Sequence, residues 1–360
     1  MSGAARPLAA PPPRPPAVVL PMPTRAAAHK VPRPRFVQIE PVGQCNLRCR
    51  MCPITYRSDA QPGSAPALID VATFRRLLDG FPEADELQLQ GLGEPLMHPQ
   101  FFEMVRYATA RGLAVSTNTN LTLLTPRRAH ACVTSGLAFL HASLDGASAE
   151  TYQYIRRGAN FAKVLRNLDR LIACRAALAS ATPRVRIVTV AMRRNLDELP
   201  AVVELAAAHG VDSVFVQHLC HDYGEHDLPA AYRSMRDFVA GESLLGVDPA
   251  HLAEAFAAAR ATATRRGVEL RLPPLTAAEP RRRSAGGCDW PQRGAYLSWR
   301  GDAMPCCMVS TPDRVNLGDM ARDGVDAVWN GPAYRAFRSA LASPEPPEVC
   351  RGCALYNGTF

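Results

Sequence analysis

The stretch Cys45-Asn46-Leu47-Arg48-Cys49-Arg50-Met51-Cys52 follows closely after a short β-branched run at 36–39. The run predicts a strand, and the stretch predicts a loop in which cysteines are spaced C-x3-C-x2-C. Thiolates at this spacing can hold three irons of a [4Fe–4S] cube and leave the fourth iron open for a ligand. A zinc site that lacks its fourth ligand, or chance spacing, would give the same pattern. Because the loop follows the first strand, we favour the iron–sulfur interpretation.

Outward from this loop, short apolar runs alternate with longer amphipathic stretches. Strands are expected at 36–39, 86–89, 114–118, 137–143, 185–190 and 213–217, and helices at 73–81, 100–111, 126–134, 161–178 and 197–209. Six strands that alternate with helices predict an α/β fold with a parallel sheet and right-handed crossovers. They are too few for an eight-unit barrel. Chemistry is expected at the carboxyl ends of the strands.

Polar motifs follow three of the expected strands. Gly91-Leu92-Gly93-Glu94-Pro95 ends the second strand, Ser116–Asn120 ends the third, and Ser143–Gly146 ends the fourth, with Arg156 further on. Glycines allow close approach of a backbone to a ligand, and arginine grips a carboxylate bidentately. Each motif alone could equally be a turn or a helix cap. Their order along the chain is the stronger argument.

Together these motifs resemble the radical S-adenosylmethionine (SAM) superfamily. The resemblance implies a partial (β/α)6 TIM-like barrel in which Cys45, Cys49 and Cys52 ligate a [4Fe–4S] cluster and SAM chelates the open iron. The position before the last cysteine is often aromatic in that family and is Met51 here. Its polarizable thioether can still pack against adenine.

The same resemblance suggests roles for the other motifs. The turn at 91–95 is similar to the family's GGEP motif, with Leu92 in place of the first glycine. It implies that Gly93 and Glu94 bind the SAM amino group. We expect Asn118 to meet the ribose hydroxyls. Similar S-x-D-G and I-R-G elements imply that Ser143, Asp145 and Arg156 belong to the SAM site, with the serine and the arginine near the SAM carboxylate.

A second group of cysteines lies near the C-terminus: Cys288, Cys306, Cys307, Cys350 and Cys353. The G-x4-C element that ends at Cys306 and the final C-x2-C resemble the SPASM/twitch extension of radical SAM enzymes. Because a full SPASM domain needs more cysteines, we expect one auxiliary [4Fe–4S] cluster on Cys288, Cys306, Cys350 and Cys353. A structural zinc site with four thiolates fits the C-x2-C spacing equally well.

The remaining cysteines include two candidates for catalysis. Cys220 follows the sixth expected strand, and Cys307 neighbours the auxiliary cysteines. Either thiol could donate a hydrogen atom or contact the substrate, and simple packing is the alternative for both. Cys132 and Cys174 lie in helical patterns and are expected in the core.

Composition limits the remaining possibilities. Eleven cysteines without a secretion signal indicate thiolate ligands in a reducing compartment, so we expect a cytoplasmic protein. No stretch of the sequence suits a membrane span. The formal charge of +8 comes mostly from the Pro/Arg-rich residues 1–35, which argues against nucleic-acid binding by the folded part. We expect a disordered tail (1–35), a radical SAM core (36–220), a helical linker (221–280) and a twitch/SPASM-like domain (281–360).

These inferences predict an enzyme that cleaves SAM reductively and abstracts a substrate hydrogen. A fully thiolate-ligated auxiliary cluster favours net oxidation, and similar twitch enzymes, such as 2-deoxy-scyllo-inosamine dehydrogenase, oxidise aminocyclitols. We therefore expect oxidation or epimerisation of a small hydroxylated or amino-sugar-like metabolite. The reductant is expected to be a flavodoxin or ferredoxin. One alternative is a radical SAM maturase of a ribosomally made peptide; another is a non-catalytic zinc or electron-transfer protein.

Overall fold

A single curved sheet organises the computed structural model, which describes residues 30–57, 66–219, 223–226, 228–275 and 288–357. The strand order is β7-β6-β5-β4-β3-β2-β1-β8-β9. The strands are β1 Phe36–Ile39, β2 Glu86–Leu89, β3 Ala114–Thr119, β4 Phe139–Ser143, β5 Arg184–Ala191, β6 Ser213–His218, β7 Glu269–Arg271, β8 Gly294–Leu297 and β9 Ala303–Met304. All neighbouring pairs are parallel except β8 and β9. This is the partial (β/α)6 barrel, extended at both edges.

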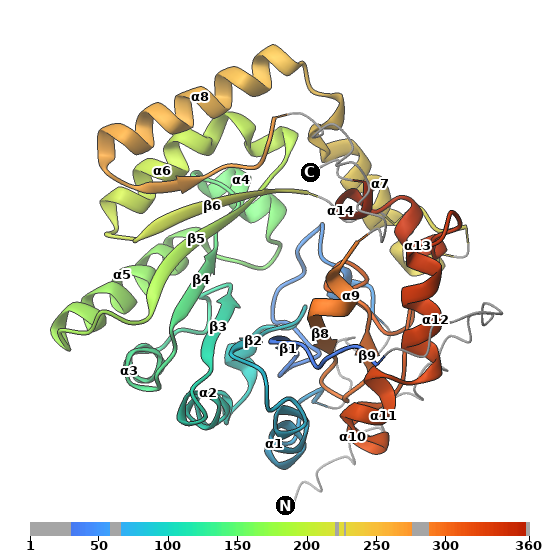
Figure 1. Cartoon of the computed structure of the whole chain (residues 1–360). Coiled ribbons are helices and arrows are strands. Elements are labelled where there is room, and N and C mark those ends of the chain that lie inside the picture. The colour runs from blue at the N-terminus through green and yellow to red at the C-terminus, as the bar shows by residue number, and fades with distance from the viewer. Residues whose placement is uncertain (1–29, 58–65, 220–222, 227, 276–287, 358–360) are drawn as a thin grey trace, which may run out of the picture.

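Helices cover the outer face of the sheet (Figure 1). They are α1 Val71–Asp79, α2 Phe101–Ala110, α3 Pro126–Thr134, α4 Ala149–Ile155, α5 Phe161–Ala177, α6 Leu199–Ala208 and α8 Pro249–Arg266. A further helix, α7 Arg233–Glu242, lies instead beside the C-terminal helices (Figure 1), and its Met235 and Val239 pack with Cys49 and Met51. The start of α3 is the one the sequence predicts: Pro126 occupies the first turn and the Thr125 hydroxyl accepts a hydrogen bond from the Arg128 N–H. The segment predicted to be a helical linker (221–280) contains two separate helices, α7 and α8.

Alternation along the strands separates the core from the barrel interior. Val37, Ile39, Leu87 and Leu89 point outward into the apolar core beneath the helices. The intervening glutamines at 38 and 88 line an interior cavity. Successive side chains of a strand face opposite sides of the sheet. The same strands therefore supply apolar side chains to the core and polar side chains to the cavity.

The C-terminal residues join the same sheet. β8 pairs in parallel with β1, from Phe36 opposite Gly294 to Ile39 opposite Leu297. The helices of this part are α9 Trp290–Arg293, α10 Met320–Asp323, α11 Val325–Trp329, α12 Pro332–Leu341, α13 Glu348–Arg351 and α14 Ala354–Asn357. They gather beside β8 and β9 (Figure 1). The expected boundary at 281 lies outside the described residues.

The residues that precede β1 also contact this C-terminal part. Residues 1–29 lie outside the described part of the chain, but 30–35 are described. Val31 N–H donates to Asn330 Oδ1 at 2.9 Å, and the Trp329 indole N–H donates to the Pro32 carbonyl at 3.0 Å. The described end of the predicted tail therefore packs against α11.

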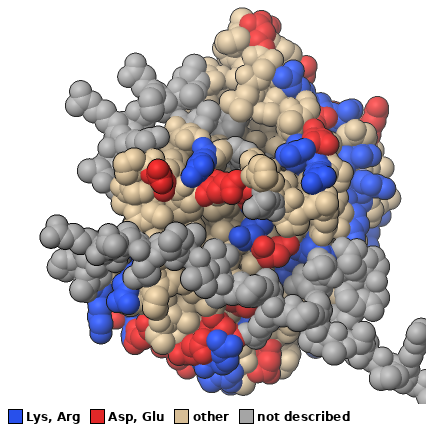
Figure 2. Space-filling model, turned by 90° about the vertical axis from the view of Figure 1, so that its right-hand side faces the viewer, with Lys and Arg blue, Asp and Glu red and all other residues tan. Residues whose placement is uncertain are grey.

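Two surface properties of the described structure bear on its surroundings. None of its helices is long and apolar enough to cross a membrane. On the face shown in Figure 2, acidic and basic side chains lie interspersed.

Candidate functional site

A cavity of about 830 Å³ lies at the carboxyl ends of the barrel strands. Its wall runs from the loop at 45–52, which we call the cysteine loop, to the C-terminal residues Cys307, Met308 and Ser310. Such a volume is in the range of small-molecule and cofactor sites. The two cysteine-rich parts of the sequence therefore meet at one cavity.

The cysteine loop is fastened to the end of α4. The Arg48 N–H donates to the Arg157 carbonyl at 2.9 Å, and the Arg50 N–H donates to the Ile155 carbonyl at 3.0 Å. Arg156 lies between these two carbonyl groups, and its Nη1 is 4.0 Å from Cys49 Sγ. Two backbone hydrogen bonds thus place a guanidinium beside the middle cysteine.

Cys45, Cys49 and Cys52 all line the cavity. Burial raises the pKa of each thiol above its ordinary value, to about 12 for Cys52, whereas the charge of Arg156 acts in the opposite direction on Cys49. Three sulfur donors beside a cation, one of them buried and two half-buried, suit a group that takes thiolates and carries net negative charge. Among the described residues no three His, Cys, Asp or Glu side chains are arranged for a single metal ion. A [4Fe–4S] cluster, which can take three thiolates and leave one iron open for a ligand, fits this donor set.

The turn at 91–95 after β2, which we call the glycine turn, packs against the residues that lead into the cysteine loop. A Cβ at Gly93 would lie 1.9 Å from the Val42 carbonyl oxygen and 2.6 Å from the Gln44 carbonyl oxygen. The next residue, Glu94, donates its N–H to the same Gln44 carbonyl at 2.9 Å. Only glycine fits at position 93, because the two backbones approach so closely.

The Glu94 carboxylate is buried and already held by the protein. It accepts hydrogen bonds from the Thr119 hydroxyl at 2.6 Å, the Asn120 N–H at 2.8 Å and the Leu96 N–H at 3.1 Å. A carboxylate has about four acceptor positions, so one remains for a donor in the cavity. Glu94 lines that cavity, as do Gly93, Asn118 and Ser143. The sequence-predicted SAM-site residues other than Asp145 are therefore brought together at its wall.

Asp145 lies behind the cavity wall. Its side chain is fully buried, its Oδ1 accepts the Val190 N–H at 2.8 Å, and its Oδ2 pairs with Arg156 Nη2 at 2.7 Å. Arg156 Nε is buried without a partner within the described structure, on a side chain that lines the cavity. The arrangement makes Asp145 a positioning residue and leaves one Arg156 donor for a ligand.

The C-terminal cysteines lie near one another. Burial raises the pKa of four thiols, those of Cys288, Cys306, Cys307 and Cys350. A negative charge on Cys353 adds to the rise in each case, because all four lie within its electrostatic reach. Cys307 lines the cavity and Cys306 does not. These positions are compatible with Cys306 as a ligand of an auxiliary cluster and with Cys307 as a residue that faces a substrate in the cavity. Cys220 lies outside the described residues.

Several site residues were missed by the sequence-based analysis. Glu40 and Arg57 form a buried ion pair beside the glycine turn, and Tyr296 of β8 lines the cavity. Arg271–Pro274 forms part of the rim beyond β7. Glu40 could have been noticed as a charge placed directly after an apolar strand. The other residues carry no local signal.

Comparison with known proteins agrees with this geometry. The family model described as the radical SAM superfamily matches residues 39–206, and the model described as an iron-sulfur cluster-binding domain (SPASM) matches residues 288–354. The two matched segments contain the two cysteine groups.

Similar proteins extend over nearly the whole chain. The tungsten-containing aldehyde ferredoxin oxidoreductase cofactor-modifying protein of Pyrococcus furiosus is 25% identical over 341 residues, covering 89% of this chain and 87% of that protein. PqqA peptide cyclase of Xanthomonas campestris is 26% identical over 338 residues, covering 90% of this chain and 80% of that protein. The crystal structure of Streptococcus suis SuiB bound to S-adenosylmethionine aligns with a TM-score of 0.66 at 16% identity, covering 90% of this chain and 72% of SuiB. At that identity the likeness concerns the fold.

Proposed function

The chain belongs to the radical SAM superfamily and carries a C-terminal iron–sulfur cluster-binding domain, and we propose that this radical SAM enzyme modifies a peptide. This family assignment implies that the enzyme uses SAM, a SAM-binding [4Fe–4S] cluster and an auxiliary iron–sulfur cluster. The substrate class, the ligand assignments and the oxidative outcome are parts of the proposal. The observation that carries it is the continuity of one cavity between the two cysteine groups.

Relatives favour a peptide over the small hydroxylated metabolite expected from the sequence. PqqA peptide cyclase is matched over most of its length, and SuiB has also been solved with its precursor peptide SuiA. The cavity supports this choice chemically, because Gln38, Gln88 and Gln90 place amide groups on its wall. Amides both donate and accept hydrogen bonds, as a peptide backbone requires.

In this proposal Cys45, Cys49 and Cys52 hold the SAM-binding cluster, and Cys288, Cys306, Cys350 and Cys353 hold one auxiliary cluster. When bound, these groups and SAM supply a hydrogen-abstracting carbon radical and an electron acceptor, which together favour net oxidation of the substrate. A flavodoxin or ferredoxin would serve as the reductant.

The chain's own residues bind and orient the reactants. Glu94 offers its remaining acceptor position to the SAM amino group, and Arg156 offers its free Nε–H to the SAM carboxylate. Asn118 and Ser143 provide polar groups for the rest of the cosubstrate. The apolar wall at Val188, Val190 and Leu219 excludes water from the reacting atoms.

Anaerobic turnover tests the proposal. The reconstituted full chain, reduced with dithionite, should convert SAM to 5′-deoxyadenosine, and Cys49→Ala should not. Peptides encoded beside the gene should then change mass when co-expressed with the wild-type chain and remain unchanged with Cys49→Ala. Stimulation of SAM cleavage by aminocyclitols, with no effect of any such peptide, would favour the small-metabolite function instead.

A further inference from the structure

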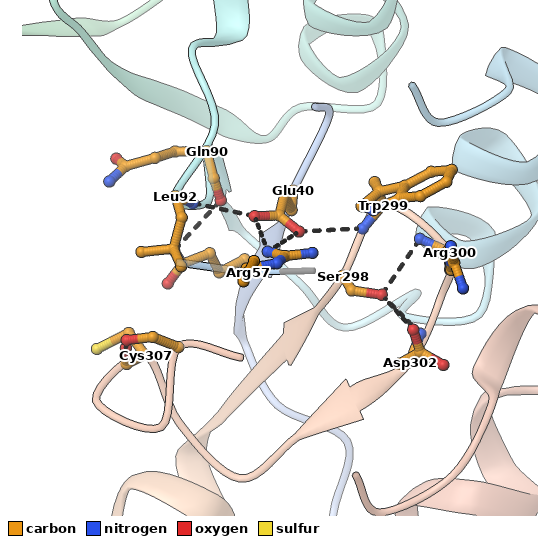
Figure 3. A network of polar contacts seen from close by, with 11 residues as sticks. Glu40, Arg57, Gln90, Leu92, Ser298, Trp299, Arg300, Asp302 and Cys307 are labelled. Atoms are coloured by element: carbon orange, nitrogen blue, oxygen red, sulfur yellow. Dashed lines mark hydrogen bonds and ion pairs between the residues drawn. The ribbon is translucent and has the colours of Figure 1, made fainter. Parts of the chain in front are cut away.

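A buried carboxylate joins three parts of the site that are distant in sequence. Glu40 follows β1 and is fully buried, and its partner Arg57 is almost fully buried. Arg57 Nη1 lies 3.2 Å from Glu40 Oε1 and 3.3 Å from Oε2. Burying two charges requires that both be well paired, so the pair constrains every group bonded to it (Figure 3).

The first of these groups is the glycine turn. The Leu92 N–H donates to Glu40 Oε1 at 3.0 Å. A Cβ at Gly91 would lie 2.3 to 2.6 Å from three atoms of the Glu40 side chain. Leu92 directly precedes Gly93 and Glu94, so Glu40 fixes the turn that we assign to the SAM amino group.

The second group is the turn between β8 and β9 in the C-terminal domain. The Trp299 N–H points to Glu40 Oε2 at 3.5 Å, and the Trp299 ring covers Gly43, where a Cβ would lie 2.3 Å from it. This turn is stiff, because the Ser298 hydroxyl donates to Asp302 at 2.8 Å and accepts the Arg300 and Asp302 N–H groups (Figure 3). The rigid β8–β9 turn therefore holds the Trp299 ring against Gly43, in the segment that leads to Cys45.

From these contacts we propose that Glu40 is a positioning residue for SAM, through which the β8–β9 turn of the auxiliary domain holds the SAM-binding turn in place. The inference rests on the proposed function, because it takes residues 91–94 as the SAM amino-group site. Glu40 itself does not line the cavity, so its effect reaches SAM through Leu92.

The geometry explains why a carboxylate is needed. Both Glu40 oxygens face Arg57 Nη1, and each also faces one backbone N–H, from Leu92 or Trp299. A glutamine would direct its NH₂ group at Arg57 and at one of these N–H groups in either orientation. Glu40→Gln should therefore displace the glycine turn while changing little volume.

The test uses the reconstituted full chain under anaerobic conditions. The dissociation constant of SAM is measured by its effect on the electron paramagnetic resonance signal of the reduced cluster, and KM and kcat are measured for 5′-deoxyadenosine formation. Glu40→Gln should raise the dissociation constant and KM by roughly ten-fold and change kcat less. Trp299→Leu, in the other domain, should shift both constants in the same direction. Glu40→Asp keeps the charge but is shorter, and should give an intermediate value.

Asp212→Asn is the matched control. Asp212 also accepts a backbone N–H, from Val185 at 2.6 Å, and pairs with Arg175 at 2.5 Å, but it precedes β6 at the opposite end of the sheet. It should lower the thermal midpoint and leave the SAM constants unchanged. SAM constants within two-fold of wild type for Trp299→Leu and any folded Glu40 variant, or equal shifts in Asp212→Asn, would overturn the inference. A wild-type chain that fails to bind SAM would instead overturn the proposed function.

Discussion

Arg156 and Asp145 form a buried ion pair beside the cysteine loop, with Arg156 Nη2 2.7 Å from Asp145 Oδ2. Burial alone would lower the pKa of Arg156, but the negative charge of Asp145, together with the smaller contributions of Cys49 and other neighbouring groups, outweighs it and raises that pKa above its ordinary value. The pair holds the guanidinium in the orientation that brings Nη1 to Cys49.

Removing one charge of this pair should cost much stability. Asp145→Asn leaves the buried guanidinium without its counter-charge, so the free energy of unfolding should fall by about 3–5 kcal/mol. Urea unfolding under anaerobic conditions measures this loss. The double variant Asp145→Leu with Arg156→Met removes both charges and should regain most of the stability, yet it should bind SAM weakly. SAM binding at wild-type strength in the double variant would exclude Arg156 as a SAM contact.

Gly93→Ala should disrupt the cysteine loop. The added methyl group would collide with the Val42 carbonyl, so the loop or the turn must move, and we expect a loss of about 1–3 kcal/mol together with reduced iron content. Gly241→Ala in α7 is the control, because a Cβ there meets nothing within 4 Å. It should retain iron and gain up to about 1 kcal/mol from helix propensity. Iron content and urea unfolding distinguish the two variants.

The barrel was predictable because its signals are local. Each short apolar run lies next to a helix of different periodicity, and the six strands of the core are found where these runs predict them. The cysteine spacing and the glycine turn are likewise written in consecutive residues. These features require no knowledge of distant contacts.

The elements and contacts that the sequence did not predict are either very short or depend on residues far apart in the chain. β7 has three residues with largely exposed side chains, so it shows no apolar alternation. α4 spans seven residues between two turn-like segments. Glu40, Arg57 and Trp299 meet only because β8 pairs with β1, a register that no local pattern encodes. Tyr296 reaches the cavity wall for the same reason.

The surface pair of His251 and Asp197 should give a small pH-dependent contribution to stability. His251 Nε2 lies 2.7 Å from Asp197 Oδ1, and this hydrogen bond raises the pKa of His251 above 6.5. The stabilisation is therefore complete below the unfolded pKa and is lost as pH rises through the folded pKa. His251→Gln should lower the thermal midpoint at about pH 6 and match the wild type above about pH 8. A difference that widens with rising pH would contradict this assignment.

Adjacent cysteines at 306 and 307 should behave differently, because only Cys307 lines the cavity. If Cys306 ligates the auxiliary cluster, Cys306→Ala should lower the iron content from roughly eight to roughly four atoms per chain. Cys307→Ala should keep the iron and alter turnover or product. Iron and sulfide analysis of both reconstituted variants, with Cys132→Ala as a buried control outside both groups, measures the difference. The opposite pattern, with iron lost only in Cys307→Ala, would assign Cys307 as the ligand and withdraw it as a hydrogen donor, since a thiolate bound to iron carries no S–H to donate.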